Sequence, residues 1–119
     1  MKKRIAIVED DTDALKLLQV ILTTAGFQTD LYPHAQDLLN AQVHLPDLYL
    51  IDINLGNASG LDLCRQLKSQ PDTQPIPVIL ISSSIDLREQ TLEACADDML
   101  AKPFDRQTLM EKVLQHMAS

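Results

Sequence analysis

The sequence has no tryptophan, and phenylalanine and tyrosine make up only 3% of its 119 residues. Side chains on which nucleic-acid bases could stack are therefore scarce. The chain also lacks positive charge: 10 lysines and arginines face 17 aspartates and glutamates, for a net charge of −7. Such an acidic surface repels nucleic acids and anionic membranes. We therefore expect partners that are proteins or cations, with no direct binding to nucleic acid or membrane.

Cysteine is sparse, because Cys64 and Cys95 lie far apart with neither a CxxC motif nor a histidine at metal-ligand spacing. This spacing suggests neither a zinc site nor a disulfide framework. No apolar run reaches the ~18 residues of a membrane span. The basic start, residues 1–4, is followed by an apolar run too short for a signal peptide. We expect a cytoplasmic protein with reduced thiols.

One apolar stretch organises the chain: residues 48–52, Leu-Tyr-Leu-Ile-Asp, stop on a carboxylate and are followed by turn-forming Asn and Gly. The pattern predicts a buried parallel strand with Asp52 at its carboxyl end. Ligands of open α/β sheets bind at that edge, which makes Asp52 a functional candidate. Taken alone, Asp52 could equally cap a loop or helix.

Apolar strand patterns and helical patterns alternate five times along the chain. This alternation predicts one doubly wound α/β domain over residues 1–119, with a five-stranded parallel sheet and helices on both faces. The expected strands cover 5–8, 27–32, 48–52, 78–81 and 98–101, and the expected helices cover 12–25, 35–41, a segment after Ser59, 86–94 and 105–116.

Several helix ends and faces are also predicted. Gly26 ends the first helix, Ser59 with Asp62 forms a capping box, and Asp86 with Glu89 forms a second one. The spacing indicates which side chains face inward. They are Ala14, Leu18, Ile21, Leu22 and Ala25 in the first helix and Leu109, Val113 and Met117 in the last.

Polar side chains follow four of the five expected strands. In a sheet of order 2-1-3-4-5, the carboxyl ends of these strands are neighbours around the switch point between the first and third strands. One pocket would therefore collect Glu9, Asp10, Asp52, Ser82 and Lys102.

Such a pocket is suited to Mg²⁺ and a phosphoryl group. Carboxylates held close together repel one another unless a hard divalent cation lies between them, and Mg²⁺ prefers oxygen ligands. Asp52 could then attack a phosphoryl group to form an acyl phosphate. Lys102 and the hydroxyl of Ser82 would share the developing charge.

Each group has a plainer interpretation when it is taken alone. The acidic triplet 9–11 could favour the positive N-terminus of the first helix. The serines 82–84 could be loop caps, and Lys102 could be a solvated charge. Their joint occurrence at neighbouring strand ends favours a shared site.

The chain resembles the response-regulator receiver domain, the phospho-accepting module of two-component signalling with a flavodoxin-like fold. The resemblance spans the whole chain and is carried by Ile-Ala-Ile-Val-Glu-Asp-Asp at 5–11, Leu-Ile-Asp at 50–52 with Gly60 beyond it, Ile-Ser-Ser at 81–83 and Ala-Lys-Pro-Phe at 101–104.

This resemblance implies the roles of the site residues. Asp52 would be the phosphoacceptor, and Mg²⁺, for which Mn²⁺ could substitute, would be held by Glu9, Asp10, Asp52 and the backbone carbonyl of Asn54. Ser82 would couple to the conformational change and Lys102 would bind the phosphoryl group. Asp11 lies beyond the metal pair and is expected to cap the helix.

The sequence departs from the family at three positions. Met99 replaces the usual aromatic of the switch, which would also involve Ser82 and Ser83; it is apolar and flexible but offers no phenol. Gly56 replaces a common proline, and Cys95 replaces a common glycine near a helix end. Two small polar residues, Asn54 and Ser84, are expected to tune the lifetime of the phosphoryl group.

The resemblance implies a switch rather than an enzyme, phosphorylated by a histidine kinase or phosphotransfer protein and acting on a protein target or a fused output domain. A phospho-dependent homodimer remains open. Because the chain ends at Ser119, we expect no output domain within it. One alternative is a phosphorylation-independent interaction module. Another is a haloacid-dehalogenase type phosphatase, which the Asn at position 54 and the short chain disfavour.

Overall fold

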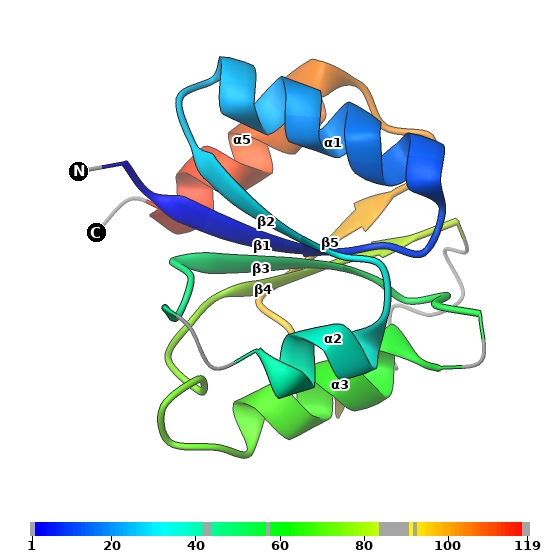
Figure 1. The fold of residues 1–119 in the computed structure, drawn as a ribbon, viewed down its shortest axis with the longest axis vertical. Helices are drawn as coiled ribbons and strands as arrows, with labels where there is room; N and C mark the ends of the chain where they lie inside the picture. The colour runs from blue at the N-terminus through cyan, green and yellow to red at the C-terminus, as the bar shows by residue number, and fades with distance from the viewer. Residues whose placement is uncertain (1, 42–43, 57, 84–90, 92, 118–119) are drawn as a thin grey trace.

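The computed structural model describes residues 2–41, 44–56, 58–83, 91 and 93–117. Its core is a five-stranded parallel sheet in the order β2-β1-β3-β4-β5, as predicted (Figure 1). The strands are β1 (Arg4–Val8), β2 (Gln28–Tyr32), β3 (Leu48–Asp52), β4 (Val78–Ser82) and β5 (Asp98–Ala101). The β3 bounds match the prediction because an apolar run that stops on Asp leaves little ambiguity.

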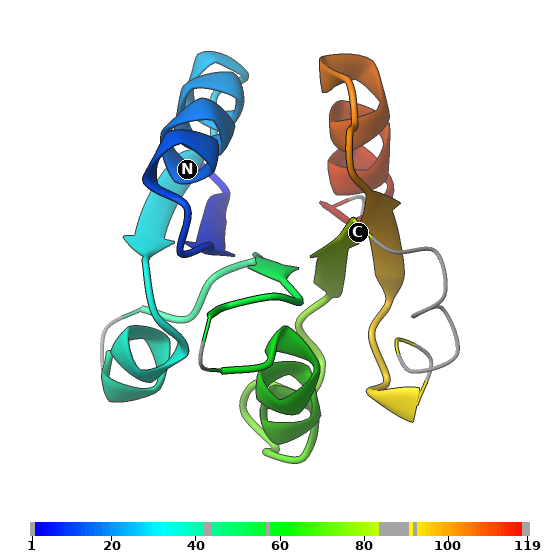
Figure 2. The same ribbon diagram turned by 90° about the vertical axis from the view of Figure 1, so that its right-hand side faces the viewer.

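Helices cover both faces of the sheet (Figures 1 and 2). On one face lie α1 (Thr12–Thr24) and α5 (Arg106–Met117), and on the other lie α2 (Ala35–Asn40) and α3 (Gly60–Lys68). These are four helices within the described residues. The fourth predicted helix, over 86–94, falls mostly outside that part of the chain, and its expected caps Asp86 and Glu89 lie wholly outside it. None of the described helices is long and apolar enough to cross a membrane.

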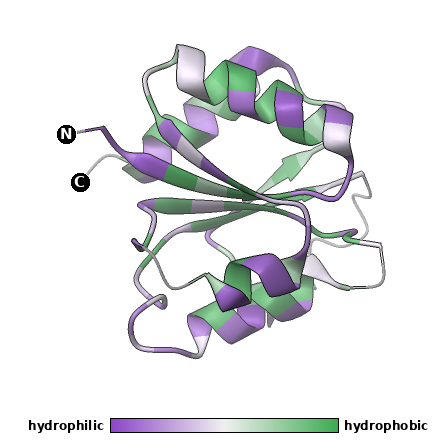
Figure 3. Ribbon diagram, viewed as in Figure 1, coloured by the Kyte–Doolittle hydropathy of each residue, from purple (hydrophilic) through white to green (hydrophobic). Residues whose placement is uncertain are grey.

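Alternation along the strands separates two hydrophobic cores. In β3, Leu48 and Leu50 point to the α1/α5 face, whereas Tyr49 and Ile51 point to the α2/α3 face. All five residues of β3 and of β4 are buried, as expected for strands covered on both sides. Figure 3 shows apolar residues along the central strands and an alternation of apolar and polar residues along the helices on both faces.

The predicted helix ends are largely found. Gly26, at a φ of 100°, follows α1 in the left-handed region. The Ser59 hydroxyl accepts a hydrogen bond from Leu61 N at 3.2 Å, as an N-cap should. Asp62 does not complete the expected capping box but forms an ion pair with Arg65 at 2.8 Å.

Two helical faces can be compared with their predictions. The last helix buries Leu109 and Val113 and half-buries Met117, as expected. The first helix buries Leu15, Leu18 and Leu22, whereas the predicted Ala25 is exposed and Ala14 is only half-buried. The buried face is rotated from the predicted one toward Leu15, because the larger Leu15 side chain gains more from burial than Ala14 does.

Cys95 has a φ of 64° and is the single non-glycine residue with positive φ among those described. Left-handed backbone costs an L-residue about 1 kcal/mol or more. The conformation explains why glycine is common at this position in the family that the sequence resembles.

Candidate functional site

The site lies where β1, β3 and β5 end. Glu9 follows β1, Asp52 is the last residue of β3 and Lys102 follows β5. The Lys102 ammonium donates hydrogen bonds to Asp52 Oδ2 and, at 3.3 Å, to Glu9 Oε1. Three segments that are distant in sequence therefore meet at one ammonium group.

These groups border a cleft of about 220 Å³. Asp10 and Asn54, both singled out by the sequence, lie along it as well. The residues that line the cleft are Glu9, Asp10, Asp11, Asp52, Asn54, Ser83 and Lys102. The four predicted acceptor and metal residues and Lys102 thus line one cleft.

The Asp52 carboxylate is held from two sides. Oδ1 accepts a hydrogen bond from the backbone N–H of Asn54 at 2.8 Å, while Oδ2 pairs with Lys102. The start of α3 packs directly against the end of β3, where Gly60 N donates a hydrogen bond to Ile53 O at 2.8 Å. A Cβ on Gly60 would come within 2.8 Å of Ile53 Cα, so only glycine fits.

Glu9 is the most constrained charge in the cleft, with 2% of its surface exposed. Burial, followed by the neighbouring Asp52 carboxylate, raises the pKa of Glu9 to about 8, against the opposing effect of Lys102. Burial alone would lower the pKa of Lys102, but Asp52 and Glu9 outweigh it and the pKa is raised. The site therefore holds more negative charge than one lysine offsets.

The donor set fits a hard divalent cation. Glu9 Oε2 is buried and has no hydrogen-bond partner among the described residues, so it is a free oxygen ligand. Asp10 is exposed, and its Oδ2 is 3.2 Å from where a Cβ on Gly56 would lie. Within the described residues no three His, Cys, Asp or Glu side chains form a metal cluster by themselves. This arrangement suits Mg²⁺, which uses one or two carboxylates and keeps several waters.

The predicted switch residues lie beside the cleft. Ser82 is buried at the end of β4, and its backbone carbonyl accepts a hydrogen bond from Lys102 N at 2.8 Å. Ser83 is exposed and lines the cleft itself. Ser84 lies outside the described residues.

Two further contacts bear on the switch and the helix cap. The hydroxyl of Thr91 donates to the Met99 sulfur at 3.6 Å, so Met99 is linked to a residue that the sequence did not single out. An exact placement of the preceding helix would have been needed to find Thr91. Asp11 caps α1 as expected, since its side chain accepts from Asp13 N at 3.0 Å and Ala14 N at 3.4 Å.

Sequence similarity places the chain in a known family. The family model of the response regulator receiver domain matches residues 5–114. The phosphate regulon transcriptional regulatory protein PhoB of Rhizobium meliloti is 34% identical over 116 residues, which cover 95% of this chain and 51% of that protein. The chain thus spans about half the length of the curated relatives that it matches.

Solved structures give the same result. A putative response regulator from Chloroflexus aurantiacus superposes with a TM-score of 0.93 at 28% identity, over 100% of both chains. The response regulator TrrA from Thermotoga maritima, in complex with Mg²⁺ and BeF, gives a TM-score of 0.86 at 25% identity, over 96% of this chain and 98% of that one. The chain belongs to the response regulator receiver domain family of two-component signalling.

Proposed function

We propose that Asp52 of this receiver domain accepts a phosphoryl group from the phosphohistidine of a histidine kinase or phosphotransfer protein. The observation that carries the proposal is the meeting of Asp52, Glu9 and Lys102 in one cleft, although Glu9 and Lys102 are 93 positions apart. A structural ion pair would not need a second buried carboxylate whose free oxygen faces no partner.

The residues can be given definite tasks in the transfer. An Asp52 carboxylate oxygen attacks the phosphorus, and its O–P bond forms as the N–P bond to the donor histidine breaks. The electron pair of that bond stays on the imidazole nitrogen. The N–H of Asn54 orients the carboxylate, and the Lys102 ammonium moves from Asp52 to the phosphoryl oxygens as the Asp52 carboxylate becomes an acyl phosphate.

Glu9, Asp10, Asp52 and the backbone carbonyl of Asn54 would hold Mg²⁺ in this cleft, with Mn²⁺ able to substitute. A bound cation supplies positive charge to the transferring phosphoryl group. The Mg²⁺ in the TrrA complex supports this assignment. The raised pKa of Glu9 also supports a cation here, because it reflects in part the repulsion between the Glu9 and Asp52 carboxylates, which a cation would relieve.

The phosphodonor would dock beside the cleft on α1. Leu17 and Val20 are exposed at 57% and 59% although both are large and apolar. Leu17 lines an apolar hollow that also contains Pro103 and Phe104 and borders Glu9 and Lys102. A partner helix packed there would bury this surface and bring its histidine to the cleft.

The output would follow from Ser82, Ser83 and Met99. When Lys102 leaves Asp52, the backbone bond from Lys102 N to Ser82 O and the Thr91 contact to Met99 connect that movement to β4 and β5. The domain would then act on a protein partner or on a covalently attached output domain, with a phospho-dependent homodimer as one form. Asn54 and Ser84 would tune how long the phosphoryl group persists.

Phosphorylation with acetyl phosphate and Mg²⁺, followed by intact-protein mass spectrometry, tests the assignment. We expect one added phosphoryl group, none in Asp52→Asn, and normal addition in Asp62→Asn, whose carboxylate lies on the surface of α3. Lys102→Ala should slow the addition about 100-fold, as does loss of one transition-state donor elsewhere, whereas the exposed Lys16→Ala should not.

The same samples separate the alternatives. Full phosphorylation of Asp52→Asn would refute the assignment. An unmodified wild-type chain would favour the phosphorylation-independent interaction module. Continuous release of phosphate from a phosphate ester would instead indicate a phosphatase, whereas we propose that the chain promotes only its own phosphorylation and dephosphorylation.

A further inference from the structure

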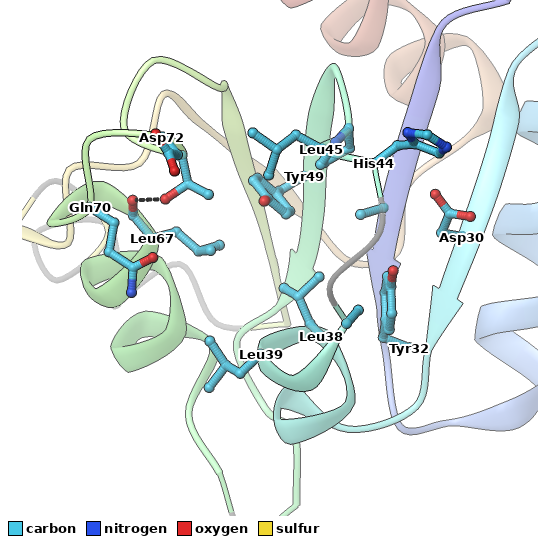
Figure 4. A pocket seen from close by; sticks show the side chains of 14 residues that line it. Asp30, Tyr32, Leu38, Leu39, His44, Leu45, Tyr49, Leu67, Gln70 and Asp72 are labelled. Carbon is cyan, nitrogen blue, oxygen red and sulfur yellow. Dashed lines mark hydrogen bonds between the residues drawn. The ribbon is translucent and has the colours of Figure 1, made fainter.

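A second hollow, of about 410 Å³, lies between the sheet and the helices α2 and α3, away from the phosphoacceptor cleft (Figure 4). Its walls come from Leu38 and Leu39 of α2 and Leu67 of α3, and Tyr32 and Tyr49 project into it from β2 and β3. None of the described residues that line it also lines the cleft. Its volume falls within the range of small-molecule sites.

The register of the sheet explains why the hollow exists. Asp30, Ala6 and Tyr49 stand side by side across β2, β1 and β3. Ala6 is the small residue in the middle, so its methyl group leaves space between the Asp30 carboxylate and the Tyr49 ring. A larger side chain at position 6 would fill the centre of this row.

The Tyr49 hydroxyl opens onto this space. Tyr49 is only 2% exposed, and no hydrogen bond to its hydroxyl is found within the described residues; in Figure 4 the dashed line joins other groups. Buried phenols normally have a hydrogen-bond partner. Burial, followed by the nearby Tyr32, raises the pKa of Tyr49 to about 12, so its hydroxyl remains a donor.

The charges around the hollow select against anions. Asp30 and Asp72 lie at its ends. Both carboxylate oxygens of Asp30 accept hydrogen bonds from Arg4 Nη1 at 2.9 Å, so Arg4 is already paired within the protein. Among the described residues that line the hollow there is no lysine or arginine, and His44 is the one basic side chain. Arg4 offsets the charge of Asp30, so an anionic ligand would be repelled mainly by Asp72, which has no cationic partner among the described residues.

We propose that this hollow binds a small, uncharged or cationic heteroaromatic molecule of about nucleobase size that carries an amino group. The ring would lie among Leu38, Leu67 and the Tyr49 ring. A ring nitrogen would accept the Tyr49 hydroxyl, and the amino group would donate to Asp30 or Asp72. The Tyr49 hydroxyl would then gain a partner that the described residues do not give it, and the amino group would use the negative charge at the ends of the hollow.

Titration of the ¹⁵N-labelled chain with adenine, adenosine and 2-aminobenzimidazole, read by amide chemical shifts, tests the site. We expect amides of residues 30–32, 38–39 and 67–73 to shift at millimolar ligand, with those of 9–11 and 52–54 unchanged. Adenosine 5′-monophosphate should bind at least about 10-fold more weakly than adenosine, because Asp72 would repel its phosphate.

Variants distinguish specific binding from weak apolar contact. Tyr49→Phe, which removes only the hydroxyl, should weaken binding about fivefold, the value of one hydrogen bond. Ala6→Val should weaken it further by reducing the space, whereas Thr23→Val, on the opposite face of the sheet, should not alter it. Thermal melts verify that each variant is folded.

Two results would overturn the proposal. One is the absence of shifts at residues 30–32 and 67–73 with all three compounds. The other is equal affinity in the wild type and in folded Tyr49→Phe and Ala6→Val. Because the probes do not involve Asp52, either result would leave the phosphoacceptor assignment intact.

Discussion

The two ends of β3 meet opposite surroundings. At the Asp52 end, the start of α3 is pressed against the strand so closely that Gly60 has no room for a methyl group. At the Tyr49 end, Ala6 leaves a hollow of about 410 Å³ on the same face as α2 and α3. The strand itself is uniformly buried, so its neighbours decide where the protein is tight and where it has space.

The charges differ in the same way. In the cleft, burial and a second carboxylate oppose the charge of Glu9 and raise its pKa. Around the hollow, the Tyr49 hydroxyl is neutral and the carboxylate of Asp30 is already paired with Arg4. The cleft therefore holds electrostatic repulsion that a cation can relieve, whereas the hollow holds an unused donor that a neutral ligand can satisfy.

The largest effect is expected from Gly60→Ala, which tests how tight the Asp52 end is. The added methyl group would overlap backbone atoms of β3, and backbone cannot move aside as a side chain can. We expect a loss of about 3 kcal/mol in the free energy of unfolding, measured by urea denaturation.

Gly26→Ala is the matched control, because a Cβ there meets nothing within 4 Å and only the positive φ is strained. It should cost about 1 kcal/mol. Equal losses in the two variants would show that the Asp52 end is not specially tight.

Asp98→Asn should lower the free energy of unfolding by a smaller amount, about 1 kcal/mol. It tests a charge with a structural role, for comparison with the charges of the cleft. Asp98 accepts from Lys112 and His116, each at 2.9 Å. Burial alone would raise the pKa of Asp98, but the hydrogen bonds from Lys112, His116 and Met99 N lower it.

The sign follows from linkage. Because the pKa of Asp98 is lower in the folded state, its carboxylate stabilises the fold at pH values above its unfolded pKa of about 4. That stabilisation is lost as the pH falls through the pKa of the folded state. Urea denaturation should therefore show the Asp98→Asn deficit at pH 7 and a vanishing deficit near pH 2. The exposed Asp62→Asn should show little change at either pH, and a deficit in Asp98→Asn that grows toward low pH would contradict this account.

Patterns local in sequence predicted most of the elements and the grouping at the cleft. Asp52 and Lys102 could be placed together because parallel strands of known order end at one edge. The rotation of α1 toward Leu15 was missed, since periodicity gives a face only to within one residue and packing decides the remainder.

The hollow could not be predicted, because it depends on residues far apart in the chain. Ala6 creates space only when Asp30 and Tyr49 take their places beside it, and that requires the register of two strand pairs. Similarly, the free oxygen of Glu9 follows from the direction in which Lys102 approaches. Sequence gives the residues at such sites, whereas tertiary packing decides which of their atoms are left without partners.

The smallest effect is expected from Ala6→Val, which tests whether the Tyr49 end has space. The two added carbon atoms would extend into the hollow, and valine suits a strand, so the unfolding free energy should change by less than about 1 kcal/mol. Ala94→Val adds the same atoms in a closed part of the α2/α3 core, where Ala94 is 0% exposed, and should cost about 1–3 kcal/mol. If urea denaturation gives both variants the same loss, the two ends of β3 are equally packed in solution, and the hollow cannot hold a ligand.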